Sequence, residues 1–229
     1  MRLISACFSL ILLVSSLIPV QGFAQSPVEI KEVTGGQINE ALAKTVPIRF
    51  LPSHPLYFLI TLKESITRFF KPSSAERSEF DFILSGKRLK ETYMLIEAGE
   101  LDAALENLNR YNSRIGKMIE QLEKARSQNQ DIGKQIAFIS ESLKNHEIFL
   151  IYFLRENDEL KQDVIGAVES FKSAVLTINA VNPGIKDRFT ILLITNESSE
   201  ENSNVSPSPN ISPSLNEASP SFKPKRIIL

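Results

Sequence analysis

Residues 101–125 read LDAALENLNRYNSRIGKMIEQLEKA. Apolar side chains recur in this segment every three or four positions, which is the period of one face of an α-helix. The positions between them are mostly Asn, Glu, Lys, Arg and Gln. The pattern therefore predicts a long helix with one buried seam, made of Leu101, Ala104, Leu108, Tyr111, Ile115, Met118, Leu122 and Ala125.

Two further seams with the same period follow. The second is Ile132, Ile136, Ile139, Leu143, His146, Leu150 and Phe153, and the third is Leu160, Val164, Ala167, Phe171, Ala174 and Ile178. Asp131 stands at the start of the second seam, where its carboxylate can cap a helix N-terminus. Pro183 and Gly184 follow the third seam and predict its end.

A fourth helix is predicted upstream of residue 101. Ser73 and Ser74 can cap it, and Gly99 marks its end. Its stripe is Phe82, Leu89, Tyr93 and Ile96. Long helices of similar length with short connections pack most simply as antiparallel neighbours. We therefore expect an all-α fold, an up-and-down antiparallel helical bundle of four to five long helices, over residues 46–195.

A shorter helix is predicted to precede these four. Ser53 can cap it, and Pro55 suits its first turn because the missing N–H has no partner there in any helix. Its apolar stripe is Leu59, Leu62, Ile66 and Phe69. We expect this helix to lie across the end or groove of the bundle, with Tyr57 as a packing residue whose hydroxyl is at the surface.

The two ends of the chain differ in composition from its middle. Residues 1–24 have the layout of a secretory signal peptide, with Arg2 before an apolar run and small residues before the predicted cleavage site. Export to the extracellular space or the cell envelope is therefore expected, and a retained membrane anchor is the alternative. Residues 25–45 are predicted to be a flexible leader, and residues 196–229 a disordered tail rich in Ser and Pro.

The apolar run 188–195 fits two structures. Its short length and β-branched residues suit a strand, although no partner strand is evident. A buried helical turn against the bundle is equally consistent with the pattern.

Composition excludes several classes of function. The 229 residues include 26 basic and 27 acidic side chains, so no charge imbalance points to nucleic acid. Cys7, within the predicted signal peptide, is the single cysteine. Disulfides, cysteine zinc sites and thiolate catalysis are therefore not expected.

The two histidines are weak candidates for chemistry. His146 lies on an apolar seam, and no further ligands converge on it in the sequence, so we expect a packing histidine with a hydrogen bond. His54 precedes a proline and is expected to be an exposed loop residue. We predict no catalytic, cofactor-binding or metal-binding residues, no cofactor, and no enzymatic activity.

Two readings of function remain. The first is a non-catalytic exported helical bundle, acting as an interaction or structural module of the cell envelope. The alternative is a ligand- or metal-binding bundle with a site near His146. A protein partner is expected, or self-association through a coiled-coil-like strip of Ile148, Phe149 and Tyr152. Membrane contact is expected to be peripheral at most, through the basic and apolar end 223–229.

Three motifs resemble one family. They are LPSHPLYFL from residue 51, LSGKRLKET from residue 84, and AGELDAALENLNRY ending at Tyr111. Together they resemble an uncharacterised bacterial family of exported helical proteins, domain of unknown function 5667. The matching residues are Pro52, Pro55, Leu56, Tyr57, Leu59, Arg88, Leu89, Glu91 and Tyr111, whereas Ile60 stands where the family usually has lysine. The resemblance implies export and a helical fold and carries no known activity.

Overall fold

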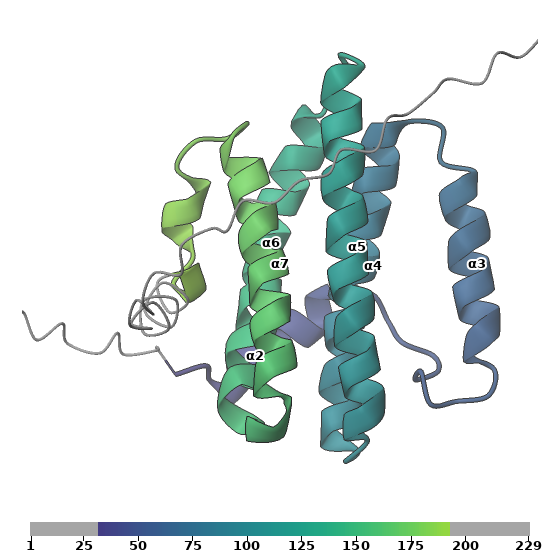
Figure 1. The fold of residues 1–229 in the computed structure, drawn as a ribbon, viewed down its shortest axis with the longest axis vertical. Coiled ribbons are helices and arrows are strands. Elements are labelled where there is room, and N and C mark those ends of the chain that lie inside the picture. Colours follow the sequence, from purple (N-terminus) through teal and green to yellow (C-terminus); the bar gives the residue numbers. More distant parts are fainter. Residues whose placement is uncertain (1–31, 193–229) are drawn as a thin grey trace, which may run out of the picture.

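The structure, a computed structural model, describes residues 32–192. Within that range lie six α-helices and no strand, which confirms the predicted all-α fold (Figure 1). The helices are α2 (Gly35–Lys44), α3 (Tyr57–Phe69), α4 (Ser74–Glu97), α5 (Leu101–Ser127), α6 (Gly133–Glu156) and α7 (Lys161–Asn179). Two short 3-10 helices, η2 (Asp158–Leu160) and η3 (Ile185–Arg188), follow α6 and α7.

Helices α4 to α7 form an antiparallel bundle (Figure 1). Helix α4 packs along α5, α5 packs on α7, and α6 contacts both α4 and α7. The predicted seams of α5, α6 and α7 are buried except at Leu101, which is half-buried. Each large apolar side chain removed from water in this core stabilises the fold by roughly 1.5–3 kcal/mol.

Several predicted helix boundaries have the expected chemistry. The Ser73 hydroxyl accepts a hydrogen bond of 3.1 Å from the Glu76 N–H at the start of α4. At α6 the N-cap is Ile132 and no side chain caps the helix, so the predicted cap by Asp131 is wrong, although its carboxylate accepts a hydrogen bond of 3.0 Å from the Gly133 N–H. Gly99 adopts a φ of 76° between α4 and α5, a left-handed conformation that favours glycine.

The predicted flexible leader, residues 25–45, is wrong over its described part. Helix α2 occupies Gly35–Lys44, and its Ile38 and Ala41 are buried against α6. Thr34 and Gln37 form a capping box at its start, each side chain accepting from the other residue's backbone N–H. This cap satisfies donors that the first turn would otherwise leave unpaired, so the two glycines at 35 and 36 are tolerated inside the helix.

The run 188–195 is described as far as Leu192, and this part contains no strand. Phe189 and Ile191 are buried, and the Phe189 ring meets Phe171 of α7 edge-on at 5.3 Å. The described part is therefore a short segment folded back on the bundle, as in the second of the two expectations. The predicted signal peptide, 1–24, and the predicted tail, 196–229, lie outside the described residues.

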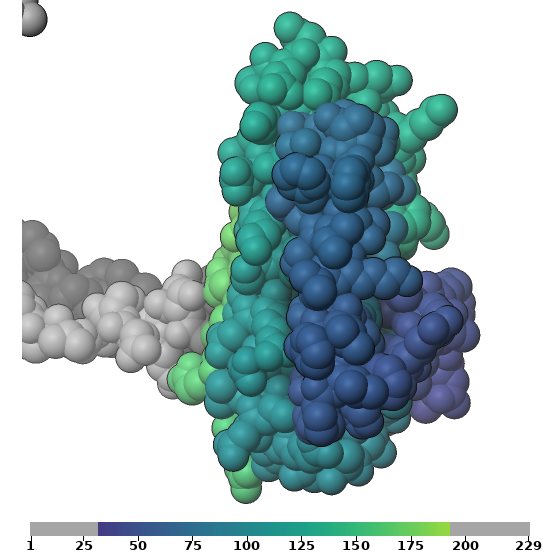
Figure 2. Space-filling view, turned by 90° about the vertical axis from the view of Figure 1, so that its right-hand side faces the viewer, coloured from purple at the N-terminus to yellow at the C-terminus, as the bar shows by residue number. Residues whose placement is uncertain are grey.

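Helix α3 stands beside the bundle rather than across its end or in its groove (Figure 1). It packs on α4, and Figure 2, which views this side, shows it as an outlying ridge along the bundle. The helix starts at Tyr57 and has no side-chain cap, so the predicted capping by Ser53 is wrong. Residues 46–56 connect α2 to α3, and residues 70–73 connect α3 to α4.

Candidate docking surface

Helix α3 is held to α4 by a buried cluster of charged side chains. Lys87 Nζ lies 2.5 Å from Glu64 Oε1 and 3.5 Å from Glu91 Oε1. Arg88 donates to the carboxylates of both Glu64 and Glu91, the latter at 2.6 Å from Nη1. All four side chains are less than a tenth exposed. Paired charges of this kind hold two helices together because separating them would leave charges buried and unpaired.

Tyr57 completes this cluster from the first turn of α3. Its hydroxyl donates a hydrogen bond of 2.9 Å to Glu91 Oε2 and accepts one from Arg88. The ring has the cations of Lys87, Arg88 and Arg110 between 5.6 and 5.9 Å from its centroid, within the range of cation–π attraction. Tyr57 is 5% exposed, so the expectation of a hydroxyl at the surface is wrong.

A second part of the cluster lies one to two turns further along α3. Arg68 Nε donates to both carboxylate oxygens of Asp81, at 2.9 and 2.8 Å. Arg114 of α5 donates to the same carboxylate at 2.9 Å and lies 3.8 Å from Glu64. Asp81 is fully buried and therefore depends on these two guanidinium groups for its charge.

The pKa values of Tyr57 and Arg88 are both raised by their surroundings in the cluster. Burial, and then the Glu91 carboxylate, raise the pKa of Tyr57, so the phenol stays protonated. Burial opposes the positive charge of Arg88, but Glu91 and Glu64 outweigh it and raise the pKa of Arg88. The buried ion pairs of the cluster therefore attach α3 to α4 and α5.

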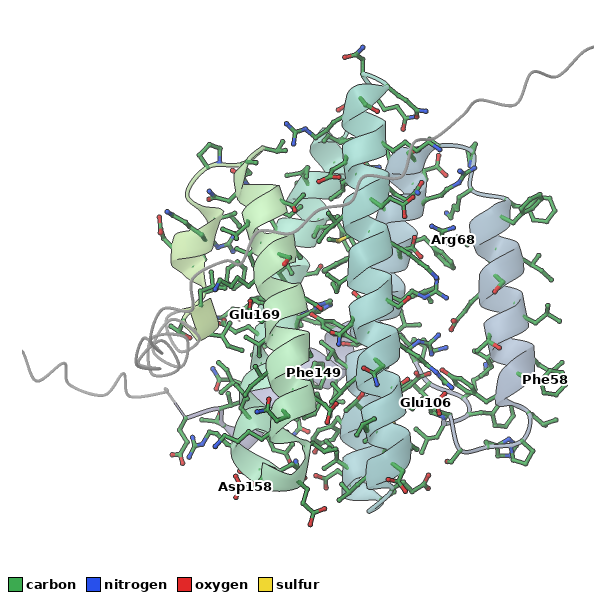
Figure 3. All side chains as sticks on the ribbon, in the orientation of Figure 1. Phe58, Arg68, Glu106, Phe149, Asp158 and Glu169 are labelled. Atoms are coloured by element: carbon green, nitrogen blue, oxygen red, sulfur yellow. The ribbon has the colours of Figure 1, made fainter. Side chains whose placement is uncertain are left out.

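Helix α3 is therefore an inverted amphipathic helix, in which the polar side and not the apolar side faces the bundle. Its polar arc, with Tyr57, Glu64 and Arg68, faces the bundle. Its apolar arc faces outward: Phe58 is 60% exposed, Leu62 53% and Phe69 79%. Figure 3 shows Arg68 pointing to the bundle and Phe58 pointing away from it.

The apolar stripe predicted for α3 is present with the predicted spacing. It faces solvent, however, and not the bundle as expected. Leu59, Leu62, Ile66 and Phe69 are all exposed. The physical reason is that α4 and α5 offer Asp81, Arg88 and Arg114 on the facing side, and these buried charges require charged partners from α3.

The exposed apolar side chains of the molecule gather at this helix. Of thirteen large apolar residues exposed within 32–192, nine belong to residues 46–70: Val46, Phe50, Leu56, Phe58, Leu59, Leu62, Ile66, Phe69 and Phe70. We call this set the outer face. Large exposed apolar patches on folded domains are typical of interaction surfaces.

Cations accompany the outer face without exposed carboxylates. Residues 45–73 contain Arg49, Lys63 and Lys71 besides Arg68, which is paired with Asp81, and their single acidic residue is Glu64, which is buried in the cluster. The surface that α3 presents to solvent is thus apolar and positively charged.

His146 is a packing residue, as expected. It is 3% exposed, stacks on Phe82 at 4.6 Å, and touches Gly86, where an added Cβ would lie 2.9 Å from its Nε2. The expected hydrogen bond is wrong, because Nδ1 is buried and has no partner among the described residues. Burial lowers the pKa of His146 to about 3.

A pocket of about 220 Å³ adjoins His146, between α2, α4 and α6. Its other lining residues include Ser142 and Asn145. Within 32–192 no group of three or more His, Cys, Asp or Glu is placed to hold a metal ion. The alternative of a metal site near His146 therefore has no ligand set in the described part of the chain.

Two other expected features are settled by burial. His54 is exposed, as predicted, and its ring stacks on Phe50 at 4.5 Å. The strip proposed for self-association is wrong, because Phe149 is fully buried and Ile148 and Tyr152 pack against the core. These residues leave no free apolar strip on α6.

The charged cluster is the feature that sequence reasoning missed. A signal was present: Asp81 and Arg88 are seven residues apart, and Glu91 is three further, so all three share a face of α4. The same face carries the buried Ser78, Ser85 and Thr92. A polar stripe of this kind on a long bundle helix indicates that buried ion pairs lie along that face.

Taken together, fold and surface define a class: an all-α bundle with a salt-bridged outer helix that turns its apolar face to solvent. Residues 49–147 match the model of the family described as Domain of unknown function (DUF5667), which confirms the resemblance. The matched range spans α3 to the middle of α6 and so includes the whole charged cluster.

No curated protein and no solved structure matches the chain significantly. None of the helices in the described range 32–192 is both long and apolar enough to cross a membrane.

Proposed function

We propose that this chain is a non-catalytic, exported interaction module of the cell envelope, which docks peripherally on an anionic lipid surface through the outer face of α3. The observation that carries the proposal is the inverted helix. The polar arc of α3 forms buried ion pairs with the bundle, whereas Phe58, Leu62 and Phe69 are exposed to water. The apolar arc is therefore free for a second contact.

The chemistry of the outer face favours lipid as the occupant. Helices that lie in a membrane interface carry Phe and Leu on one side and Lys or Arg beside them. Arg49, Lys63 and Lys71 are so placed, with no exposed carboxylate between residues 45 and 73. Each basic residue near an anionic bilayer contributes about 1 kcal/mol, whereas an acidic residue would be repelled.

Vesicle flotation tests the docking. The protein is expected to float with vesicles containing phosphatidylglycerol, to bind less at high salt, and to bind pure phosphatidylcholine weakly. The double variant Phe58→Ser, Phe69→Ser should lose flotation. Phe138→Ser, which removes an exposed phenylalanine of α6, is the matched control and should float like the parent.

Other occupants give different results. If vesicles do not bind, and light scattering instead shows a dimer that the Phe58→Ser, Phe69→Ser variant abolishes, the face is a contact between copies of the chain and lipid docking is wrong. Flotation that is unchanged in the double variant would equally contradict the role of α3.

Export is supported by residues 1–24 and is tested separately. Fractionation of cells that express the tagged chain should recover it outside the cytoplasm. Deletion of residues 1–24 should move it to the cytoplasmic fraction, and an unchanged distribution would contradict export.

A further inference from the structure

A cavity of about 460 Å³ lies between α3, α4 and the segment 46–50. It adjoins the outer face, with which it shares Val46, Phe50, Leu56 and Leu59, and it extends inward along the flank of α3 past Ile60 to Thr67. Phe58, Leu62, Ile66, Phe69 and Phe70 of the outer face do not line it. On α4 its wall is formed by Phe80 and Ile83. A volume of 300–1,000 Å³ is typical of pockets that bind small molecules.

The cavity has the shape of a channel along two helices. The lining residues on α3 recur at helical spacing over eleven positions, which corresponds to about 16 Å along the helix axis. A cavity of this length and volume has room for one extended hydrocarbon chain in van der Waals contact with its apolar walls.

The walls of the channel are mostly apolar and its free charges are positive. Nine of its fourteen lining residues are apolar. Arg49 and Lys63 are exposed and form no ion pair with any residue in the range 32–192. The one acidic group of the lining, Glu64, is already bound to Lys87 and Arg88.

We propose that this channel binds a single-chain anionic amphiphile, a hydrocarbon chain that carries a carboxylate or a phosphate. The chain lies between α3 and α4 against Leu59 and Ile83, and the anionic head is held by Lys63 and Arg49. The ligand is a free fatty acid or lysophospholipid taken from solution, or an acyl chain of a lipid in the surface on which α3 docks. The channel is thus a ligand site beyond the docking function.

Titration with laurate, followed by displacement of the fluorescent fatty acid cis-parinaric acid, tests the site without any membrane. Saturable one-to-one binding is expected. Ile83→Trp fills the channel, and Leu59→Glu places a charge in its wall, so each should weaken laurate binding by about tenfold or more. Leu176→Glu introduces the same charge at an exposed leucine of α7 and should bind like the parent.

The head-group contact has its own variant. Lys63→Gln together with Arg49→Gln should weaken laurate binding by about tenfold and leave displacement by the uncharged dodecanol unchanged. A circular dichroism spectrum and an unfolding curve for each variant show that α3 and α4 remain folded. Equal loss for laurate and dodecanol would contradict the role assigned to the two cations.

The two proposals fail in different ways. Lack of saturable laurate binding, or binding that Ile83→Trp and Leu59→Glu leave unchanged, overturns the channel even if the protein floats with vesicles. Laurate binding that is lost in Ile83→Trp but kept in the Phe58→Ser, Phe69→Ser variant supports the channel even if flotation fails. A chain from a docked bilayer is distinguished from a free acid by whether laurate competes with flotation.

Discussion

The hydroxyl of Tyr57 on α3 donates a 2.9 Å hydrogen bond to Glu91 on α4, and both residues are buried. The two residues belong to different motifs of the family resemblance, thirty-four positions apart in the chain. Their contact brings the two motifs together in the charged cluster. Residues of both motifs therefore attach α3 to the bundle. This contact is also what fixes the polar arc of α3 toward the bundle.

Removal of the Tyr57 hydroxyl should destabilise the protein. Tyr57→Phe takes a buried partner from both Glu91 and Arg88, which should lower the free energy of unfolding by about 1–3 kcal/mol. Tyr152→Phe removes a similar 2.9 Å bond to Glu97 at an exposed site and should cost less than about 0.5 kcal/mol. Urea unfolding of both variants measures the difference, and equal losses would contradict a clamp at Tyr57.

The same substitution at Tyr111 should have the opposite sign. The Tyr111 hydroxyl is buried and has no hydrogen-bond partner among the described residues. Because an unpaired buried hydroxyl is unfavourable, Tyr111→Phe should leave the free energy of unfolding unchanged or raise it by up to about 1 kcal/mol. A clear loss of stability in the same urea experiment would show that a water molecule or another group satisfies this hydroxyl.

Gly86 should not tolerate a methyl group. An added Cβ would lie 2.9 Å from His146 Nε2, inside contact distance, so Gly86→Ala should destabilise the fold by about 1–3 kcal/mol. Gly116, in the middle of α5, has nothing within 4 Å of an added Cβ. Gly116→Ala should therefore stabilise the protein by about 0.5–1 kcal/mol through helix propensity. Thermal unfolding would refute the contact if both variants shifted Tm in the same direction.

Stability should fall in mild acid because of His146. Its pKa is lowered to about 3 in the folded protein, so below the ordinary value of 6.5 the unfolded chain binds more protons than the folded one. The free energy of unfolding should drop by about 2 kcal/mol between pH 7 and pH 5 from this group. His146→Asn should remove that slope, whatever its effect on absolute stability.

The exposed His54 supplies the control for this experiment. His54→Gln, which removes the second histidine of the described chain, is measured beside His146→Asn as the matched substitution. Parallel pH curves for the parent and His146→Asn would mean that His146 is protonated in the folded state and is not buried as described.

Glu147 should hold the last described segment on the bundle. Its Oε1 accepts hydrogen bonds of 3.0 Å from the Thr190 hydroxyl and the Ile191 N–H. Glu147→Ala leaves that buried N–H unpaired, so amide exchange at Ile191 should accelerate by about tenfold or more. Glu141→Ala removes an exposed pair with Arg188 and should change exchange little. Slow exchange at Ile191 in both variants would contradict this role.

The sequence predicted the bundle well because its core is apolar and periodic. The seams of α5 to α7 needed only the period of a helix, and those residues are buried. The same period could not tell which side of α3 is buried, because its polar arc of Tyr57, Glu64 and Arg68 repeats with the same spacing as its apolar stripe. Which arc faces inward depends on charges of α4 and α5 that are distant in sequence.

One local signal was weighed wrongly. Gly35 and Gly36 suggested a flexible segment, although Thr34 and Gln37 around them form a capping box that starts α2. Glu64 and Asp81 carry no local signal of their partners, yet both are buried and paired with cations from other helices. Partners from other helices cannot be assigned before the packing is known, and for this reason the cluster and the adjoining channel were absent from the sequence-based account.

The anchoring of Ile191 by Glu147 also has a mechanical meaning. The segment that ends at Leu192 follows η3, which packs on α7, whereas α3 packs on α4 on the other side of the bundle (Figure 1). A pulling force applied at Leu192 would act first on the Glu147 anchor and the α6–α7 pair, and the salt-bridged α3 would carry little of the load. Helix α3 and the segment after η3 are thus held by separate contacts, so strain on one would leave the contacts of the other in place.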